Sequence, residues 1–230
     1  PAIIVADGCE IPNILHGICE AHDVALFTAR HPSASVIDQL RLYLSRELAE
    51  KVSLHGVFMD VLGLGVMITG DSGAGKSELG LELISRGHGL VADDVVELSR
   101  IAPTVLEGRC PEMLQDFIEV RGLGLINIRT IFGETACRRK MRLRLICHLD
   151  RRQPGPDDPC RLPLQQETQD ILGVKVARVV LPVAAGRNLA VLLEAAVRST
   201  ILKLRGIDST QEFIDRQARA LHAEEAYRAD

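Results

Sequence analysis

The sequence has no tryptophan and few other aromatic residues, with two tyrosines and five phenylalanines among 230 residues. Proteins that hold single-stranded nucleic acid stack its bases on aromatic side chains, so this class of binding is not expected. The net charge of −4 also gives no general electrostatic attraction to nucleic acid. No apolar run approaches the roughly 18 residues of a membrane-spanning helix, and the first residues lack a signal-peptide pattern. We therefore expect neither a nucleic-acid partner nor a membrane partner.

Disulfide frameworks and zinc sites are also not expected. The six cysteines form no C-x-x-C pair and no Cys/His ligand spacing; they are Cys9, Cys19, Cys110, Cys137, Cys147 and Cys160. We interpret them as reduced thiols of a cytoplasmic protein. The chain is 47% hydrophobic and 25% charged, which is typical of a globular protein with one large domain and an appendage, or with two small domains.

One stretch fits a nucleotide-binding motif without a mismatch. Residues 70–77 read Gly-Asp-Ser-Gly-Ala-Gly-Lys-Ser, after the apolar run 66–69 and before a helix-like segment. A strand, a glycine-rich loop and a helix in this order form the phosphate cradle of a P-loop. Lys76 would reach the β- and γ-phosphates of ATP, and the Ser77 hydroxyl would bind Mg²⁺. The predicted nucleotide-binding residues are Gly70, Asp71, Ser72, Gly73, Ala74, Gly75, Lys76 and Ser77.

The chain divides into two parts near residues 50–53. Residues 1–50 predict a partial N-terminal α/β domain, with strands at 2–6 and 24–27, a helix at 13–22 and a second helix at 35–50. Residues 51–230 predict the P-loop catalytic domain and its C-terminal helices. Because the chain starts at Pro1 and runs directly into a strand-like segment, we expect its N-terminus to be truncated.

Hydrophobic periodicity outlines the second part. Two runs at 54–62 and 64–69 predict a hairpin that leads into the P-loop. Further strands are expected at 89–92, 141–149, 174–183 and 189–193, and helices at 195–205 and 210–227. In the 141–149 strand, Leu143, Leu145 and Cys147 are expected on one face.

The strand at 89–92 ends in Asp93 and Asp94. A carboxylate at a strand end beside a P-loop is typical of a residue that holds Mg²⁺ or accepts a proton. Adjacent residues of a strand point to opposite faces, so only one of the two can take the catalytic role. The residues alone do not choose between them.

Two missing motifs narrow the kind of P-loop protein. No asparagine precedes a lysine, so the Asn-Lys-x-Asp motif of guanine-specific GTPases is absent. The Leu-Ser-Gly-Gly-Gln stretch of transporter-type ATPases is absent as well.

Four blocks of sequence resemble the HPr kinase/phosphorylase family, in family order. The first block is His55-Gly56-Val57 followed by residues 63–78, and the second is Leu90-Val91-Ala92-Asp93-Asp94. The third is Glu119-Val120-Arg121-Gly122-Leu123-Gly124-Leu125-Ile126-Asn127, and the fourth is Pro182-Val183-Ala184-Ala185-Gly186-Arg187-Asn188. Two positions depart from the family pattern: Ala185 replaces a proline, and Pro163 replaces a glycine in Arg161-Leu162-Pro163. The family's N-terminal domain is longer than the part present here.

The resemblance implies a bifunctional enzyme. It implies phosphorylation of a serine of the phosphocarrier protein HPr by ATP or pyrophosphate, and removal of that phosphate by inorganic phosphate to give pyrophosphate. Regulation of carbon metabolism and of the sugar phosphotransferase system is implied with it. The implied fold is α/β, with a P-loop phosphotransferase core related to phosphoenolpyruvate carboxykinase. A cytoplasmic homohexamer is also implied.

The same resemblance assigns roles to individual residues. It favours Asp94 over Asp93 as the general base, and it adds His55, Lys76 and Arg161 to the catalytic set. It implies that Glu119 holds Mg²⁺ together with Ser77. Two loop regions are implied in catalysis, the second of them in dephosphorylation: Ile118, Glu119, Val120, Arg121, Gly122, Leu123, Gly124, Leu125, Ile126 and Asn127; and Pro182, Val183, Ala184, Ala185, Gly186 and Arg187.

Two other classes of function stay open on the sequence. One is a P-loop phosphotransferase that acts on a small metabolite and needs no protein acceptor. The other is a regulatory module that binds ATP and Mg²⁺ without transferring phosphate. The C-terminal helices are the expected place for protein contacts, or else they pack in the core.

Overall fold

The computed structural model describes residues 1–151, 167–184 and 186–229, and the side chains only as far as Arg219. Arg161, Leu162, Pro163 and Ala185, which the sequence singled out, lie outside the described residues. The chain forms two compact units, Pro1–Ala49 and Glu50–Asp230. Within the described part, no helix combines the length and the apolar character that crossing a bilayer requires.

The first unit is a small βαβα arrangement. Its elements are β1 (Ala2–Val5), α1 (Asn13–Ala21), β2 (Ala25–Thr28) and α2 (Ser33–Glu47). Strands β1 and β2 pair in parallel, as a crossover through a helix requires. The backbone N–H of Ser33, at the start of α2, donates to the carboxylate of Asp7. The elements expected for residues 1–50 are all present, each within about three residues of its expected bounds.

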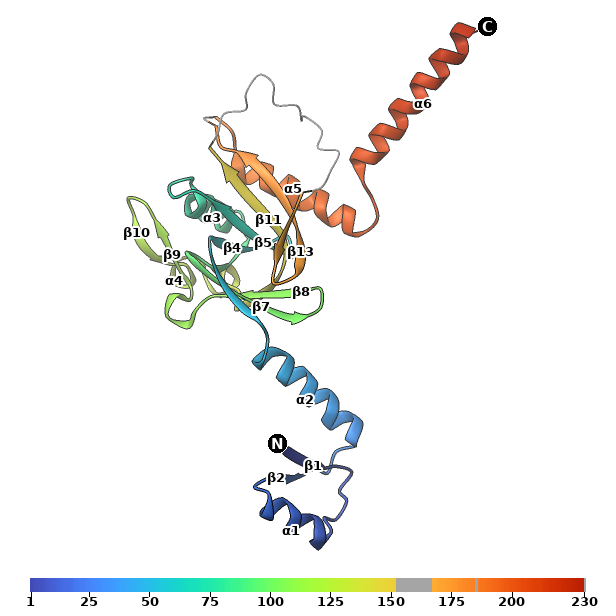
Figure 1. Ribbon diagram of the computed structural model, residues 1–230. Coiled ribbons are helices and arrows are strands. Elements are labelled where there is room, and N and C mark those ends of the chain that lie inside the picture. The colour runs from blue at the N-terminus through green and yellow to red at the C-terminus, as the bar shows by residue number, and fades with distance from the viewer. Residues whose placement is uncertain (152–166, 185, 230) are drawn as a thin grey trace. The chain divides into compact units, whose positions relative to one another are not determined.

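A curled sheet of nine strands forms the body of the described second unit (Figure 1). Its strands run in the order β3-β7-β8-β11-β5-β4-β6, and β13 extends it from β11 and carries β12 at its edge. The strands are β3 (Lys51–His55), β4 (Val57–Val61), β5 (Leu64–Gly70), β6 (Gly89–Ala92), β7 (Val95–Ala102), β8 (Val105–Arg109), β11 (Lys140–Asp150), β12 (Glu167–Ile171) and β13 (Val174–Pro182).

Helices and a small hairpin complete this unit. The helices are α3 (Lys76–Ser85), α4 (Ile128–Phe132), α5 (Leu189–Leu204) and α6 (Ser209–Ala229), with 3₁₀ turns at Glu112–Leu114 and Glu134–Ala136. The hairpin joins β9 (Phe117–Val120) to β10 (Gly124–Asn127). As the sequence predicted, β4 and β5 form an antiparallel hairpin that leads directly into the P-loop.

Alternating side chains of the central strands separate two apolar clusters. Met59 and Ile68 point into the cluster that packs under α3 and α5, whereas Phe58 and Met67 point into the cluster lined by β7 and β8. Strand β11 runs in parallel with β5, so its C-terminal end lies beside the start of the P-loop. Because apolar side chains pack on both faces of the sheet, the strand ends beside the P-loop are held in position.

Two sequence predictions in this unit are wrong. Residues 189–193 are the first turns of α5 and not a strand, because Asn188 caps the helix by accepting a hydrogen bond from the Val191 N–H at 3.0 Å. Leu143 lies in the opposite cluster from Leu145 and Cys147, because a bulge between Leu143 and Leu145 shifts the register of β11. An extra residue in a strand moves the following side chains to the other face.

Candidate active site

The P-loop connects β5 to α3 through backbone conformations that glycine allows. Gly70 has φ of +144°, and a Cβ at this position would stand 2.7 Å from the Leu149 carbonyl oxygen on β11. Gly73, in the middle of the loop, has φ of +74°. These conformations turn the chain sharply from the strand into the helix, so that the N-terminus of α3 opens toward the loop, as an anion site requires.

Lys76 lies folded back over this loop. Its side chain is only 8% exposed, and its ammonium donates to the carbonyl oxygens of Gly70 at 2.9 Å and of Asp71 at 3.0 Å. Both partners are neutral, so no carboxylate neutralises the charge through these contacts. The ammonium is therefore held at the phosphate cradle and keeps its attraction for an anion.

Asp93 connects the P-loop to the β9–β10 hairpin. Its carboxylate accepts the Ser77 hydroxyl at 3.1 Å and the Glu119 N–H at 2.8 Å. The residue is 6% exposed, and this burial raises the pKa of its carboxyl group against the lowering effect of these two hydrogen bonds. Asp93 thus sets the position of the Ser77 hydroxyl and of β9. The sequence indicated Asp93 only as an alternative to Asp94 for the catalytic role. It did not predict the hydrogen bonds from Ser77 and Glu119 to Asp93.

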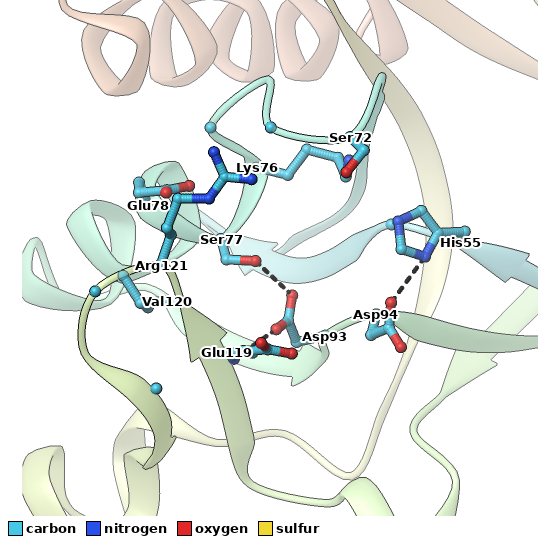
Figure 2. A pocket seen from close by; sticks show the side chains of 15 residues that line it. His55, Ser72, Lys76, Ser77, Glu78, Asp93, Asp94, Glu119, Val120 and Arg121 are labelled. Atoms are coloured by element: carbon cyan, nitrogen blue, oxygen red, sulfur yellow. Dashed lines mark hydrogen bonds and ion pairs between the residues drawn. The ribbon is translucent and has the colours of Figure 1, made fainter.

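Asp94 points away from Asp93 and lies open to solvent (Figure 2). His55 Nδ1 lies 2.9 Å from Asp94 Oδ1, and both side chains are about 60% exposed, at 62% and 61%. Asp94 has φ of +65°, and the Val95 N–H closes the turn onto the Asp93 carbonyl at 2.8 Å. Aspartate adopts this left-handed conformation more readily than most residues do. This turn points the two carboxylates in different directions. Asp93 makes internal hydrogen bonds, and Asp94 is accessible from solvent.

A cavity of about 380 Å³ joins these groups (Figure 2). It is bounded by the P-loop on one side and by the strand ends and the β9–β10 hairpin on the other. Its lining contains His55, Gly56, Ser72, Gly73, Gly75, Lys76, Ser77, Glu78, Asp93, Asp94, Glu119, Val120, Arg121, Gly122 and Gly124. Most of the predicted site residues from the first three sequence blocks therefore surround one space.

The fourth block lies at a second cavity. This cavity measures about 500 Å³ and is lined by Val183, Gly186, Arg187, Asn188 and Leu189 together with residues of the P-loop and α3. Gly75 and Glu78 line both cavities, so the two spaces meet along the start of α3. Glu78 ends the first sequence block, but the sequence predicted no role for it in the site.

Some predicted residues lie away from both cavities. Ile118 is fully buried in the core, and Asn127 caps α4 by accepting the Thr130 N–H at 2.9 Å. Leu123 and Leu125 are exposed on the hairpin. Arg161 and Ala185, as stated above, lie outside the described residues.

Oxygen groups in the cavity form a donor set that suits a magnesium ion. The Ser77 hydroxyl and the carboxylates of Asp93 and Glu119 are hard ligands, which Mg²⁺ prefers. Among the described residues, no group of three or more His, Cys, Asp or Glu side chains forms a complete metal cage. Mg²⁺ usually binds through one or two protein groups plus phosphate oxygens, so the residues present fit a metal that arrives with its nucleotide.

Cysteine chemistry does not fit this site. The five cysteines that the structure describes are all free. Burial raises the pKa of the Cys110 thiol to about 11 and that of Cys147 to about 12. These thiols stay protonated at neutral pH, and the thiolate is the reactive form.

Comparisons with known proteins show which proteins this chain is similar to. Residues 46–217 match the family model of the HPr Serine kinase C-terminal domain. Two similar proteins are named HPr kinase/phosphorylase. The protein from Azoarcus sp. strain BH72 is 84% identical, and the match covers 96% of this chain and 71% of that protein. The protein from Aromatoleum aromaticum is 80% identical, and the match covers 97% of this chain and 72% of that protein. The structure of the Hpr(Ser) kinase/phosphatase from Coxiella burnetii superimposes with a TM-score of 0.61 at 37% identity, over 70% of this chain and 98% of that one. The predicted α/β P-loop kinase fold is thereby confirmed.

Proposed function

The chain belongs to the HPr kinase/phosphorylase family, and we propose that it phosphorylates a serine of HPr and also removes that phosphate. The observation that carries the mechanism is the single cavity in which Lys76, Ser77 and Asp94 meet. A phosphate cradle and an accessible carboxylate on its opposite side are what transfer of a γ-phosphoryl group to a hydroxyl requires.

In the forward direction, Asp94 would accept the proton of the serine hydroxyl. The serine oxygen forms a bond to the γ-phosphorus of ATP as the bond to the β,γ-bridging oxygen breaks. Lys76 would stabilise the negative charge on the transferred phosphoryl group. His55, whose Nδ1 lies 2.9 Å from Asp94, would orient this carboxylate.

In the reverse direction, the same residues would support phosphorolysis. An oxygen of inorganic phosphate attacks the phosphoserine phosphorus, the bond from phosphorus to the serine oxygen breaks, and pyrophosphate forms. Protonated Asp94 would return its proton to the serine oxygen, as microscopic reversibility demands. Arg187 at the adjoining cavity and Arg161 would bind phosphate groups, because a guanidinium offers several donors to an anion.

Mg²⁺ would be held by the Ser77 hydroxyl and the Glu119 carboxylate, and Asp93 would position them through the Ser77 hydroxyl and the Glu119 backbone N–H. When bound, it would offset negative charge on the phosphate oxygens. On the family resemblance, we also propose that the enzyme is a cytoplasmic homohexamer.

Transfer to HPr is the direct test. The purified protein is incubated with [γ-³²P]ATP, Mg²⁺ and HPr, and the labelled HPr is then chased with unlabelled phosphate. We expect label on a serine of HPr that returns as pyrophosphate. Turnover of ATP without any protein acceptor would instead support a small-metabolite kinase, and ATP binding without transfer would support a regulatory module.

Replacing Asp93 with asparagine tests the proposed metal site. Asparagine offers one acceptor oxygen and one NH2 donor in place of two acceptor oxygens. If its oxygen keeps the Glu119 N–H, its NH2 group faces Ser77, and the Ser77 oxygen then accepts a hydrogen bond with a lone pair that would otherwise be free for the metal. Because changes in groups that orient metal ligands cost about tenfold to a hundredfold in metal affinity, we expect the Mg²⁺ concentration for half-maximal kinase activity to rise by about tenfold or more. A Mg²⁺ titration of kinase activity measures this, and an unchanged half-maximal concentration would contradict the positioning role.

A further inference from the structure

Two arginine side chains reach the middle of the P-loop from different elements. Arg121 comes from the turn after β9, and Arg151 directly follows β11. A Cβ placed on Gly73 would stand 3.7 and 3.8 Å from the two terminal nitrogens of Arg121, and 3.8 Å from the Nη1 of Arg151. Both guanidinium groups therefore lie against the same point of the loop. Sequence reasoning did not single out Arg151, because its neighbours in the chain carry no motif.

Neither guanidinium group is paired with a carboxylate in the described part of the chain. Within residues 1–151, 167–184 and 186–229, neither Arg121 nor Arg151 makes an ion pair or a hydrogen bond, and Glu78, which lines the same cavity as Arg121, forms no ion pair with it. Among the described residues, the ammonium of Lys76 on the same loop donates hydrogen bonds to two carbonyl oxygens and to no carboxylate. In Figure 2, the guanidinium group of Arg121 is drawn near the Lys76 side chain and Glu78. Like charges brought together repel one another, and an anion between them removes that repulsion.

We infer that Arg151 and Arg121 form a guanidinium clamp over Gly73 that binds the phosphate chain of ATP or pyrophosphate on the side facing away from the P-loop backbone. This inference rests on the proposed function. The planar guanidinium donates two parallel hydrogen bonds to phosphate, which a lysine cannot do. Two such groups next to Lys76 enclose a polyanion between the loop and the clamp.

The clamp matters most for pyrophosphate. This ligand has no nucleoside, so all of its affinity comes from contacts to phosphate oxygens. A hydrogen bond to a charged group is worth enough that its loss weakens binding by about tenfold to a hundredfold. We therefore expect Arg151→Gln to raise the Kd of pyrophosphate by that factor and the Kd of ATP by less, with the KM for HPr unchanged.

The experiment uses the full chain and calorimetric titration with pyrophosphate and with Mg-ATP, beside the HPr transfer assay. Arg144→Gln is the matched control, because Arg144 lies on β11, is exposed like Arg151, and its loss changes the net charge equally. Its effect on pyrophosphate binding should stay below about twofold, as expected for a surface charge. Arg151→Lys should give an intermediate affinity. In the double variant Arg151→Gln/Arg121→Gln, the loss of binding free energy for pyrophosphate should differ from the sum of the two single losses, because both guanidinium groups bind the same ligand.

The inference and the proposed function fail in different ways. Wild-type affinity for pyrophosphate in Arg151→Gln overturns the clamp, and so does an equal loss in Arg144→Gln. Suppose that the wild-type chain binds pyrophosphate, that Arg151→Gln weakens this binding, and that the wild-type chain does not label HPr. The clamp would then be supported and the proposed function would be contradicted.

Discussion

Replacing Lys76 with methionine is expected to lower both phosphorylation and phosphorolysis of HPr by about a hundredfold to a thousandfold, the range found when a group that stabilises charge in a transition state is removed. The ammonium is held by the carbonyl oxygens of Gly70 and Asp71, at the loop where phosphate would bind in either direction. Methionine keeps the length of the buried chain but removes the charge. Initial rates of both reactions at saturating HPr measure the effect.

The control for this experiment is Lys175→Met, which removes a charge from an exposed position on β13. It should retain nearly wild-type rates. Thermal unfolding of Lys76→Met checks that the fold is intact, since the two carbonyl oxygens lose their donor. Phosphorolysis at the wild-type rate in Lys76→Met would show that the P-loop lysine does not serve the reverse reaction, and the shared-site mechanism would have to be abandoned.

The P-loop could be predicted from the sequence because its signal is local. The eight residues of the motif, the strand before them and the helix after them are contiguous, so backbone geometry alone brings them together. The hairpin of β4 and β5 was predictable for the same reason. Both predictions depend on neighbours in the chain and need no knowledge of distant packing.

The first turns of α5 show where local signals fail. The run Leu-Ala-Val-Leu-Leu at 189–193 is short and apolar, and such runs fit a strand and a buried helix equally well. The choice is made by the Asn188 cap and by packing of Ala190 and Leu193 into the cluster under α3. The bulge in β11 is a similar case, because it depends on pairing with β5 across more than 70 residues of sequence.

The different roles of Asp93 and Asp94 also depend on contacts with residues that are distant in the sequence. Alternation along a strand predicts that they point to opposite sides, but which side meets the P-loop depends on where β6 lies relative to α3 and β9. The structure brings Ser77 and the Glu119 backbone to Asp93, and it brings His55, from the end of β3, to Asp94. No sequence pattern links these segments, which lie 16 to 39 residues from their partners.

Replacing Asp94 with asparagine is the sharpest test of this division. Asparagine retains an oxygen that can accept a hydrogen bond from His55, and the exposed position tolerates the change without a packing cost. Only the ability to take up a proton is lost. General-base catalysis contributes about a hundredfold to ten-thousandfold, so kinase kcat should fall within that range while the Kd of Mg-ATP stays unchanged.

The comparison with Asp93→Asn separates a base from a positioning residue. Asp94→Asn should lower kcat at every Mg²⁺ concentration, whereas Asp93→Asn should be partly restored by excess Mg²⁺, since its defect is weaker metal binding. Asp38→Asn, on the exposed face of α2, serves as the charge-matched control and should leave kcat unchanged. If Asp94→Asn keeps wild-type kcat and Asp93→Asn loses it without rescue, then the buried carboxylate is the base. The acceptor serine would in that case have to enter the cavity deeply enough to reach past Ser77.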